Sequence, residues 1–160
     1  MNNYNELLQK IKNTHYPELK DIQIKLKPLK ILKKVFMVTL PFSNNIYYNK
    51  DVILNCNEPA LKAVLMHELY HIIQFKKLNI LQKIFFIPKY HLNYNYRRKH
   101  ELVAHVEVVR SGFKEELLEL NNFVMSRYPK DVWKKKLSKY YLTENEINTI
   151  ENNKKDKKYC

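Results

Sequence analysis

The sequence has 160 residues and a formal net charge of +13, from 29 basic and 16 acidic residues. With 45% hydrophobic residues, the chain is long enough for one domain with a core of its own. Its one glycine, Gly112, excludes the glycine-rich loops of nucleotide-dependent enzymes, because neither GxGxxG nor a P-loop can be written with a single glycine.

The first third of the chain predicts one helix and three strands. Apolar residues at helical spacing predict the helix over 2–16. Apolar and polar residues alternate over 21–29, which is the period of a half-buried strand. Residues 34–40 and 45–55 are two further strand candidates, with turn residues between them.

A capped helix follows the strands. Asn57 is suited to the N-cap position, and an apolar stripe of helical spacing runs from Leu61 to Ile72. The basic and aromatic segment beyond it is broken by Pro88, which predicts only a short helix over 81–87.

The last third of the chain predicts helices alone. Residues 97–113 fit a helix that ends at Gly112, and two more helical stretches cover 114–128 and 131–141. A final helix over 143–152 opens with a capping box of Thr143 and Glu146.

This order predicts an α+β fold with a small three-stranded sheet at the front, packed on helices. We expect one domain over 1–160, with a core at about 20–112, a helical extension at about 113–151 and a mobile tail at 152–160. The sequence shows no signal-peptide core, no transmembrane run and no disulfide framework, which favours a cytoplasmic protein.

The segment HELYH, residues 67–71, has the spacing of a zinc hydrolase site. Residues four apart lie on one face of a helix, so His67 and His71 can direct two imidazole nitrogens at one ion. Glu68 lies about 100° round the helix from His67, where a carboxylate can act as general base on a zinc-bound water.

A catalytic zinc site needs a third protein ligand. The metzincin spacing requires glycine at 74 and histidine at 77, but the chain has Gln74 and Lys77. Glu101, on the later helical segment, would complete a His2Glu site. Glu107 is a rival ligand, although it lies about 120° away from the face that Glu101 shares with His105.

The order of strand, HExxH helix and glutamate-bearing helix resembles the gluzincin clan of metallopeptidases. Residues 46–112 are similar to the strand-and-helix unit of the HtpX and CAAX-prenyl-protease group, whose small soluble relatives are called minigluzincins. The resemblance depends on HELYH together with Glu101 and Ala104. It implies that His67, His71 and Glu101 bind zinc and that Glu68 is the general base.

The chain departs from the gluzincin pattern at His105. Gluzincins usually place an aspartate at this position, where it hydrogen-bonds a ligand histidine. A histidine supplies no fixed negative charge, so we expect either a weaker site or another role, such as stabilising the oxyanion. An ordinary surface histidine is the alternative.

Cys160 offers a further zinc ligand, because a thiolate binds zinc well. The tail 152–160 could fold back and place Cys160 in the open coordination position, which would keep the enzyme latent. C-terminal segments that block the cleft are a feature of minigluzincins. The alternative is a free thiol without a role.

Residues 76–99 form a basic stretch. No acidic residue lies between Glu68 and Glu101, and aromatic residues alternate with the lysines and arginines. This pattern predicts a surface for an anionic partner, either nucleic acid or a membrane, and it would also suit a cleft for an acidic substrate.

The expected function is a zinc-dependent endopeptidase that acts on a peptide or protein substrate. An unpaired edge strand within 45–55 would hold the substrate in extended form. A tyrosine could stabilise the oxyanion, but the sequence alone does not show which of the 12 tyrosines this would be. Two alternatives are a nucleic-acid-binding regulator that resembles ImmA and a latent or degenerate zinc-binding protein.

Overall fold

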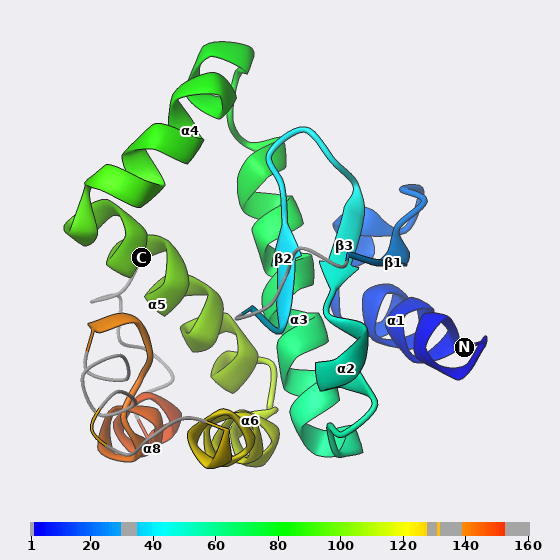
Figure 1. The fold of residues 1–160 in the computed structure, drawn as a ribbon, viewed down its shortest axis with the longest axis vertical. Helices are drawn as coiled ribbons and strands as arrows, with labels where there is room; N and C mark the ends of the chain where they lie inside the picture. Colours follow the sequence, from blue (N-terminus) through cyan, green and yellow to red (C-terminus); the bar gives the residue numbers. More distant parts are fainter. Residues whose placement is uncertain (1, 30–34, 128–130, 132–138, 153–160) are drawn as a thin grey trace.

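The computed structural model describes residues 2–29, 35–127, 131 and 139–152. Its architecture is mixed α+β, with a small sheet on a larger set of helices (Figure 1). The elements in chain order are α1 (Asn2–His15), the 3-10 helix η1 (Pro17–Leu19), β1 (Lys25–Pro28), β2 (Met37–Thr39), β3 (Asn45–Tyr48), α2 (Lys50–Ile53), α3 (Glu58–Lys76), α4 (Ile80–Leu92), α5 (Tyr94–Arg110), α6 (Lys114–Ser126) and α8 (Glu144–Asn152).

The sheet has the strand order β1-β3-β2. Strand β3 pairs in parallel with β1 and antiparallel with β2, so Ile46 lies between Leu26 and Thr39 in the register. The prediction of an edge strand within 45–55 is therefore wrong, because β3 is paired on both sides. Among the described residues, β2 is the edge strand on the side of the cavity described below.

The second half of the segment 45–55 is helical rather than extended. The Asn49 side chain accepts a hydrogen bond from the Asp51 backbone N–H and so caps the short helix α2. This local cap outweighs the strand preference of Val52 and Ile53.

Helix α3 is the central element of the fold. Its Asn57 cap is confirmed, since the Asn57 side chain accepts a 2.9 Å hydrogen bond from the Ala60 backbone N–H. The expected apolar stripe from Leu61 to Ile72 is buried. Helices α1, α5 and α6 and strand β2 all pack against α3 (Figure 1).

Helix α4 runs through Pro88, so the predicted break at that residue is wrong. A capping box of Asn79 and Gln82 fixes the start of α4. Ile84 and Pro88 are both exposed, so water can reach the carbonyl group that loses its hydrogen bond to the proline. The helix therefore tolerates a proline in its second half.

The remaining helices follow the sequence closely. Helix α5 ends before Gly112, whose φ of 87° is the left-handed conformation that stops a helix. Helix α8 has the expected capping box, in which Thr143 Oγ1 accepts from the Glu146 backbone N–H. Of the helix expected over 131–141, residues 132–138 lie outside the described part of the chain.

One buried apolar cluster joins the elements. It includes residues of α1, the sheet, α3, α5, α6 and α8, for example Leu8, Ile46, Leu65, Leu117 and Ile147. Within the described part of the chain, none of the helices has both the length and the apolar character needed to cross a membrane.

Candidate metal centre

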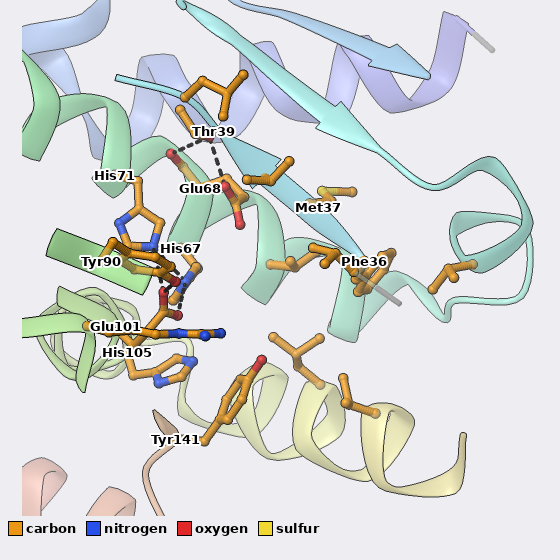
Figure 2. A pocket seen from close by; sticks show the side chains of 18 of the residues that line it. Phe36, Met37, Thr39, His67, Glu68, His71, Tyr90, Glu101, His105 and Tyr141 are labelled. Carbon is orange, nitrogen blue, oxygen red and sulfur yellow. Dashed lines mark hydrogen bonds and ion pairs between the residues drawn. The ribbon is translucent and has the colours of Figure 1, made fainter. Parts of the chain in front are cut away.

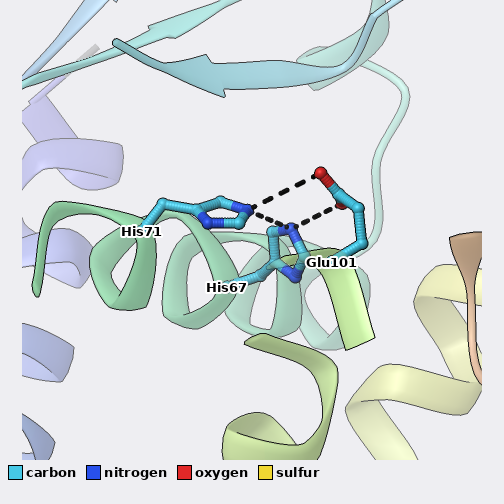
Figure 3. Close-up of side chains that lie close together, drawn as sticks. All are labelled: His67, His71 and Glu101. Atoms are coloured by element: carbon cyan, nitrogen blue, oxygen red, sulfur yellow. Dashed lines mark hydrogen bonds and ion pairs between the residues drawn. The ribbon is translucent and has the colours of Figure 1, made fainter. Parts of the chain in front are cut away.

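Three side chains from two helices meet beneath the sheet edge. His67 and His71 lie on successive turns of α3, and Glu101 reaches them from α5 (Figure 3). The Nε2 atoms of the two histidines are 2.9 Å apart. Glu101 Oε2 lies 3.3 Å from His67 Nε2, and Glu101 Oε1 lies 3.9 Å from His71 Nε2.

These distances fit a single metal ion. Ligand atoms at 2.0–2.1 Å from a tetrahedral zinc lie roughly 3.3 Å from one another. The donor atoms of His67, His71 and Glu101 all lie within 4.8 Å of one another, and all three residues are buried. The group could therefore hold a metal ion, through two imidazole nitrogens and one carboxylate.

The protonation states also suit metal binding. Burial, followed by the neighbouring His67, lowers the pKa of His71, so its imidazole is neutral and keeps a lone pair at neutral pH. Burial alone would raise the pKa of Glu101, but His67, His71 and Tyr90 together hold it well below its usual value. Glu101 is therefore an anionic donor.

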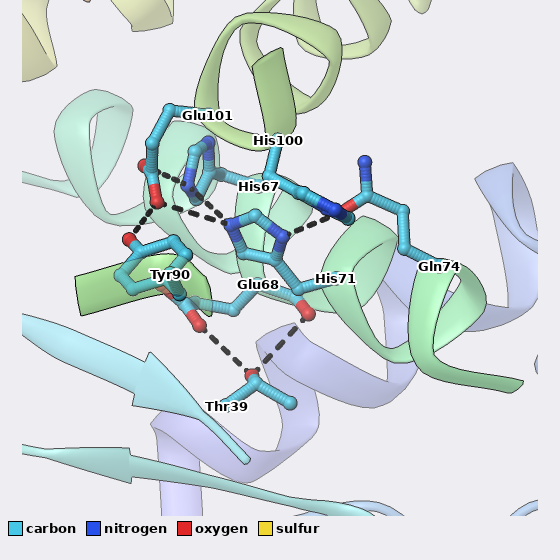
Figure 4. A network of polar contacts seen from close by, with 8 residues as sticks. All are labelled: Thr39, His67, Glu68, His71, Gln74, Tyr90, His100 and Glu101. Carbon is cyan, nitrogen blue, oxygen red and sulfur yellow. Dashed lines mark hydrogen bonds and ion pairs between the residues drawn. The ribbon is translucent and has the colours of Figure 1, made fainter. Parts of the chain in front are cut away.

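Gln74 orients one of the histidines. Its side-chain oxygen lies 2.7 Å from His71 Nδ1, one turn further along α3 (Figure 4). If Nδ1 carries the proton and donates a hydrogen bond to Gln74, then Nε2 has a free lone pair, which faces His67 and Glu101. His100 Nδ1 lies 3.4 Å from the same oxygen.

Glu68 contacts the sheet and is not itself a member of the donor group. The Thr39 hydroxyl donates a 2.8 Å hydrogen bond to Glu68 Oε2, and both residues are buried (Figure 4). Burial raises the pKa of Glu68 to about 7, against the lowering effects of His71 and of the Thr39 hydrogen bond. A carboxyl group with this pKa can accept and release a proton near neutral pH.

Tyr90 reaches the centre from α4. Its hydroxyl donates a hydrogen bond to Glu101 Oε1. Burial and the adjacent Glu101 carboxylate raise the pKa of Tyr90, so the phenol keeps its proton at neutral pH. The site therefore contains a phenol O–H that can donate a hydrogen bond, beside the group of His67, His71 and Glu101.

His105 lies against the centre but makes no hydrogen bond to it. It is 1% exposed, so the alternative of a surface histidine is wrong. Its ring packs 4.7 Å from that of His67 and 4.9 Å from that of Tyr141, measured between centroids. Among the described residues, neither His105 Nδ1 nor His67 Nδ1 has a hydrogen-bond partner. The described contact between His105 and His67 is therefore ring packing, and not the hydrogen bond that the gluzincin aspartate makes to a ligand histidine.

A cavity of about 490 Å³ opens over the centre (Figure 2). Strand β2 forms one wall, helices α4 and α5 supply others, and Tyr141 and side chains of α6 line the far side. The lining includes His67, His71, Glu68, Glu101 and His105, so each can be reached from the cavity.

The structure brings most of the sequence-derived site residues together. The third member of the donor group is Glu101 and not Glu107, whose charged neighbours are Arg110, Glu18 and Lys77. Cys160 lies outside the described residues. Thr39, Gln74 and Tyr90 were not among the predicted site residues. Only Gln74 has a sequence signal, namely its place one turn after His71.

Comparison with known proteins adds no relative. Neither a scan against protein-family models, nor a search of curated proteins, nor a search of solved structures returns a match.

Proposed function

We propose that the chain is a zinc-dependent endopeptidase of gluzincin type. The observation that carries this proposal is the His67, His71 and Glu101 donor group, with the Glu68 carboxylate beside it in an open cavity. A structural zinc is usually held by four protein ligands, whereas catalytic sites have three and an open position. The described donor group has three.

Bound zinc would supply Lewis-acid polarisation of the substrate carbonyl and a water of lowered pKa. Glu68 is suited to the proton transfers. Its raised pKa and its place at the cavity wall let the carboxylate accept a proton from the attacking water and deliver it to the leaving amine. Thr39 fixes the orientation of that carboxylate.

Strand β2 is suited to hold the substrate. Met37 to Thr39 line the cavity, and among the described residues the strand is paired with β3 on one side only. An extended peptide that adds to the free edge would place its carbonyl groups along the wall that carries Glu68. This assignment replaces the expected edge strand within 45–55.

Tyr90 is the best candidate for stabilising the oxyanion. Its hydroxyl already contacts Glu101, and its high pKa maintains the O–H donor that a developing negative charge requires. His105 is a second residue at the cavity wall that could donate a hydrogen bond to the oxyanion. Burial and the neighbouring His67 lower its pKa well below the usual value, so it is a neutral imidazole.

The test is hydrolysis of an unfolded protein such as casein. We expect activity with zinc, its loss on chelation, and recovery when zinc is restored. Glu68→Gln should lose activity by several orders of magnitude and keep its zinc, because Glu68 is not in the donor group. Full zinc binding without hydrolysis in the wild-type protein would instead indicate a metal-binding protein without peptidase activity.

A further inference from the structure

The outward side of α4 is an apolar surface that the described residues leave exposed. Helix α4 contacts the fold mainly through α5, and Phe86 is its only buried residue. Five large apolar residues of α4 are more than half exposed, with exposed fractions from 51% to 86%: Ile80, Leu81, Ile84, Phe85 and Leu92. We call these five residues the outer face of α4.

Helix geometry places the members of the outer face on one side of α4. At 100° per residue, its five members fall within an arc of about 140°. Phe86 and Tyr90 lie on the opposite side of the helix, where their rings stack on one another and Tyr90 donates a hydrogen bond to Glu101. One helix thus has an inner side that packs on the protein and an outer side that packs on nothing described.

Positive charge borders the outer face. Lys83 and Lys89 lie on its two flanks, at about 300° and 180° on the helical wheel when Ile80 is placed at 0°. Lys76 and Lys77 precede the helix at the end of α3, and there is no acidic residue from 69 to 100. Lysines on both flanks of an apolar stripe are typical of a helix that lies in a membrane interface.

We propose that the outer face of α4 docks on an anionic lipid surface. The apolar side chains enter the boundary between headgroups and acyl chains, and the flanking lysines contact the anionic headgroups. Helix α4 has 13 residues and a length of roughly 20 Å, less than the thickness of the hydrocarbon core. The helix therefore lies along the surface and does not span it.

The arrangement of charge separates this partner from others. A nucleic-acid surface places cations and stacking aromatics at its centre, whereas here the centre is mostly aliphatic and the cations lie at the edges. A second copy of the chain would bring the same lysines against one another, which is repulsive. A lipid surface with negative headgroups complements both the apolar centre and the basic edges.

The experiment is flotation of the full chain with vesicles at about 0.15 M salt. One set of vesicles is phosphatidylcholine, and the other contains roughly one third phosphatidylserine. We expect binding to the anionic vesicles. Leu81→Gln and Phe85→Gln should each weaken it about tenfold, because each removes a large apolar side chain from the interface. Lys83→Gln and Lys89→Gln should each weaken it about fivefold.

A matched control is available in Leu54→Gln. Leu54 is 63% exposed and Leu81 is 66% exposed, but Leu54 follows α2, away from α4. Its substitution should leave vesicle binding unchanged. Circular dichroism and thermal unfolding of each variant would separate loss of binding from loss of fold.

Several outcomes would overturn the proposal. These are no binding of the wild-type chain to anionic vesicles, or equal losses in Leu81→Gln and Leu54→Gln. Self-association that Leu81→Gln abolishes, without vesicle binding, would assign the face to a second copy. Binding of an oligonucleotide that needs Lys83 and Lys89 but not Leu81 would assign it to nucleic acid. The metal ligands are untouched in every variant, so this result is independent of the proposed peptidase activity.

Discussion

The Thr39 hydroxyl donates a 2.8 Å hydrogen bond to Glu68 Oε2, which links the edge strand β2 to the central helix α3. Both side chains are buried at the cavity wall. In the proposed mechanism, this bond fixes the general base relative to the strand that would hold the substrate. It also opposes the effect of burial on the pKa of Glu68.

Thr39→Val should therefore reduce hydrolysis about tenfold or more without changing zinc content, since partners that orient active-site groups have effects of this size. Loss of the hydrogen bond raises the pKa of Glu68, so the acidic limb of the pH–activity profile should move to higher pH. Thr39→Ser keeps the donor and should resemble the wild-type protein. An unchanged acidic limb in Thr39→Val would contradict the assigned role of this contact.

Gln74→Leu should weaken zinc binding about 10- to 100-fold, because it removes the acceptor that faces His71 Nδ1. Gln74→Glu retains an acceptor oxygen and should keep the affinity at or above that of the wild-type protein. Competition with a chelator of known zinc affinity measures both variants. Equal zinc affinity in Gln74→Leu and the wild-type protein would mean that Gln74 does not orient the ligand.

In the metal-free protein, the titration of Glu68 by itself should reduce stability as the pH rises toward 7. Burial raises the pKa of Glu68 from 4.5 in the unfolded chain to about 7 in the folded one. Between pH 4.5 and pH 7, Glu68 therefore keeps a proton in the folded state that it has lost in the unfolded state. Above pH 7, ionisation of the buried carboxyl group lowers the free energy of unfolding by about 3 kcal/mol.

Glu68→Gln removes this titration. The free energy of unfolding of Glu68→Gln, minus that of the wild-type protein, should therefore increase between pH 4 and pH 8. Urea unfolding at several pH values, in the presence of a chelator, measures the difference. A constant difference between the two proteins across this range would show that the pKa of Glu68 is the same in the folded and unfolded states.

Latency through the C-terminal tail remains a prediction, because residues 153–160 lie outside the described part of the chain. Removal of these residues should increase zinc-dependent hydrolysis if Cys160 occupies the open coordination position. Cys160→Ser should have much of the same effect, because a hydroxyl is a poorer zinc ligand than a thiolate. If neither the truncation nor Cys160→Ser changes the activity, the C-terminal tail does not keep the enzyme latent.

Features that depend on near neighbours in the sequence were predictable. His67 and His71 face one another because a helical turn places them together, and the caps at Asn57 and Thr143 depend on contacts three residues away. The α+β class followed from the same local patterns. Glu101 was predictable only as a candidate, because spacing alone left Glu107 open.

Features that depend on the arrangement of distant segments were not predictable. The parallel pairing of β1 with β3 makes β2 the edge strand, and no local pattern encodes that order. The contacts of Thr39 with Glu68 and of Tyr90 with Glu101 arise only when β2 and α4 pack beside α3 and α5. The continuation of α4 through Pro88 also depends on exposure, which the sequence does not state.

Zinc content per chain, by elemental analysis, tests the central claim most directly. The wild-type protein should hold about one zinc, and Glu101→Ala should hold much less, because it removes the carboxylate of the donor group. Glu107→Ala, a glutamate substitution on the same helix outside that group, should retain the wild-type content. Full zinc in Glu101→Ala, or none in the reconstituted wild-type protein, would contradict the account.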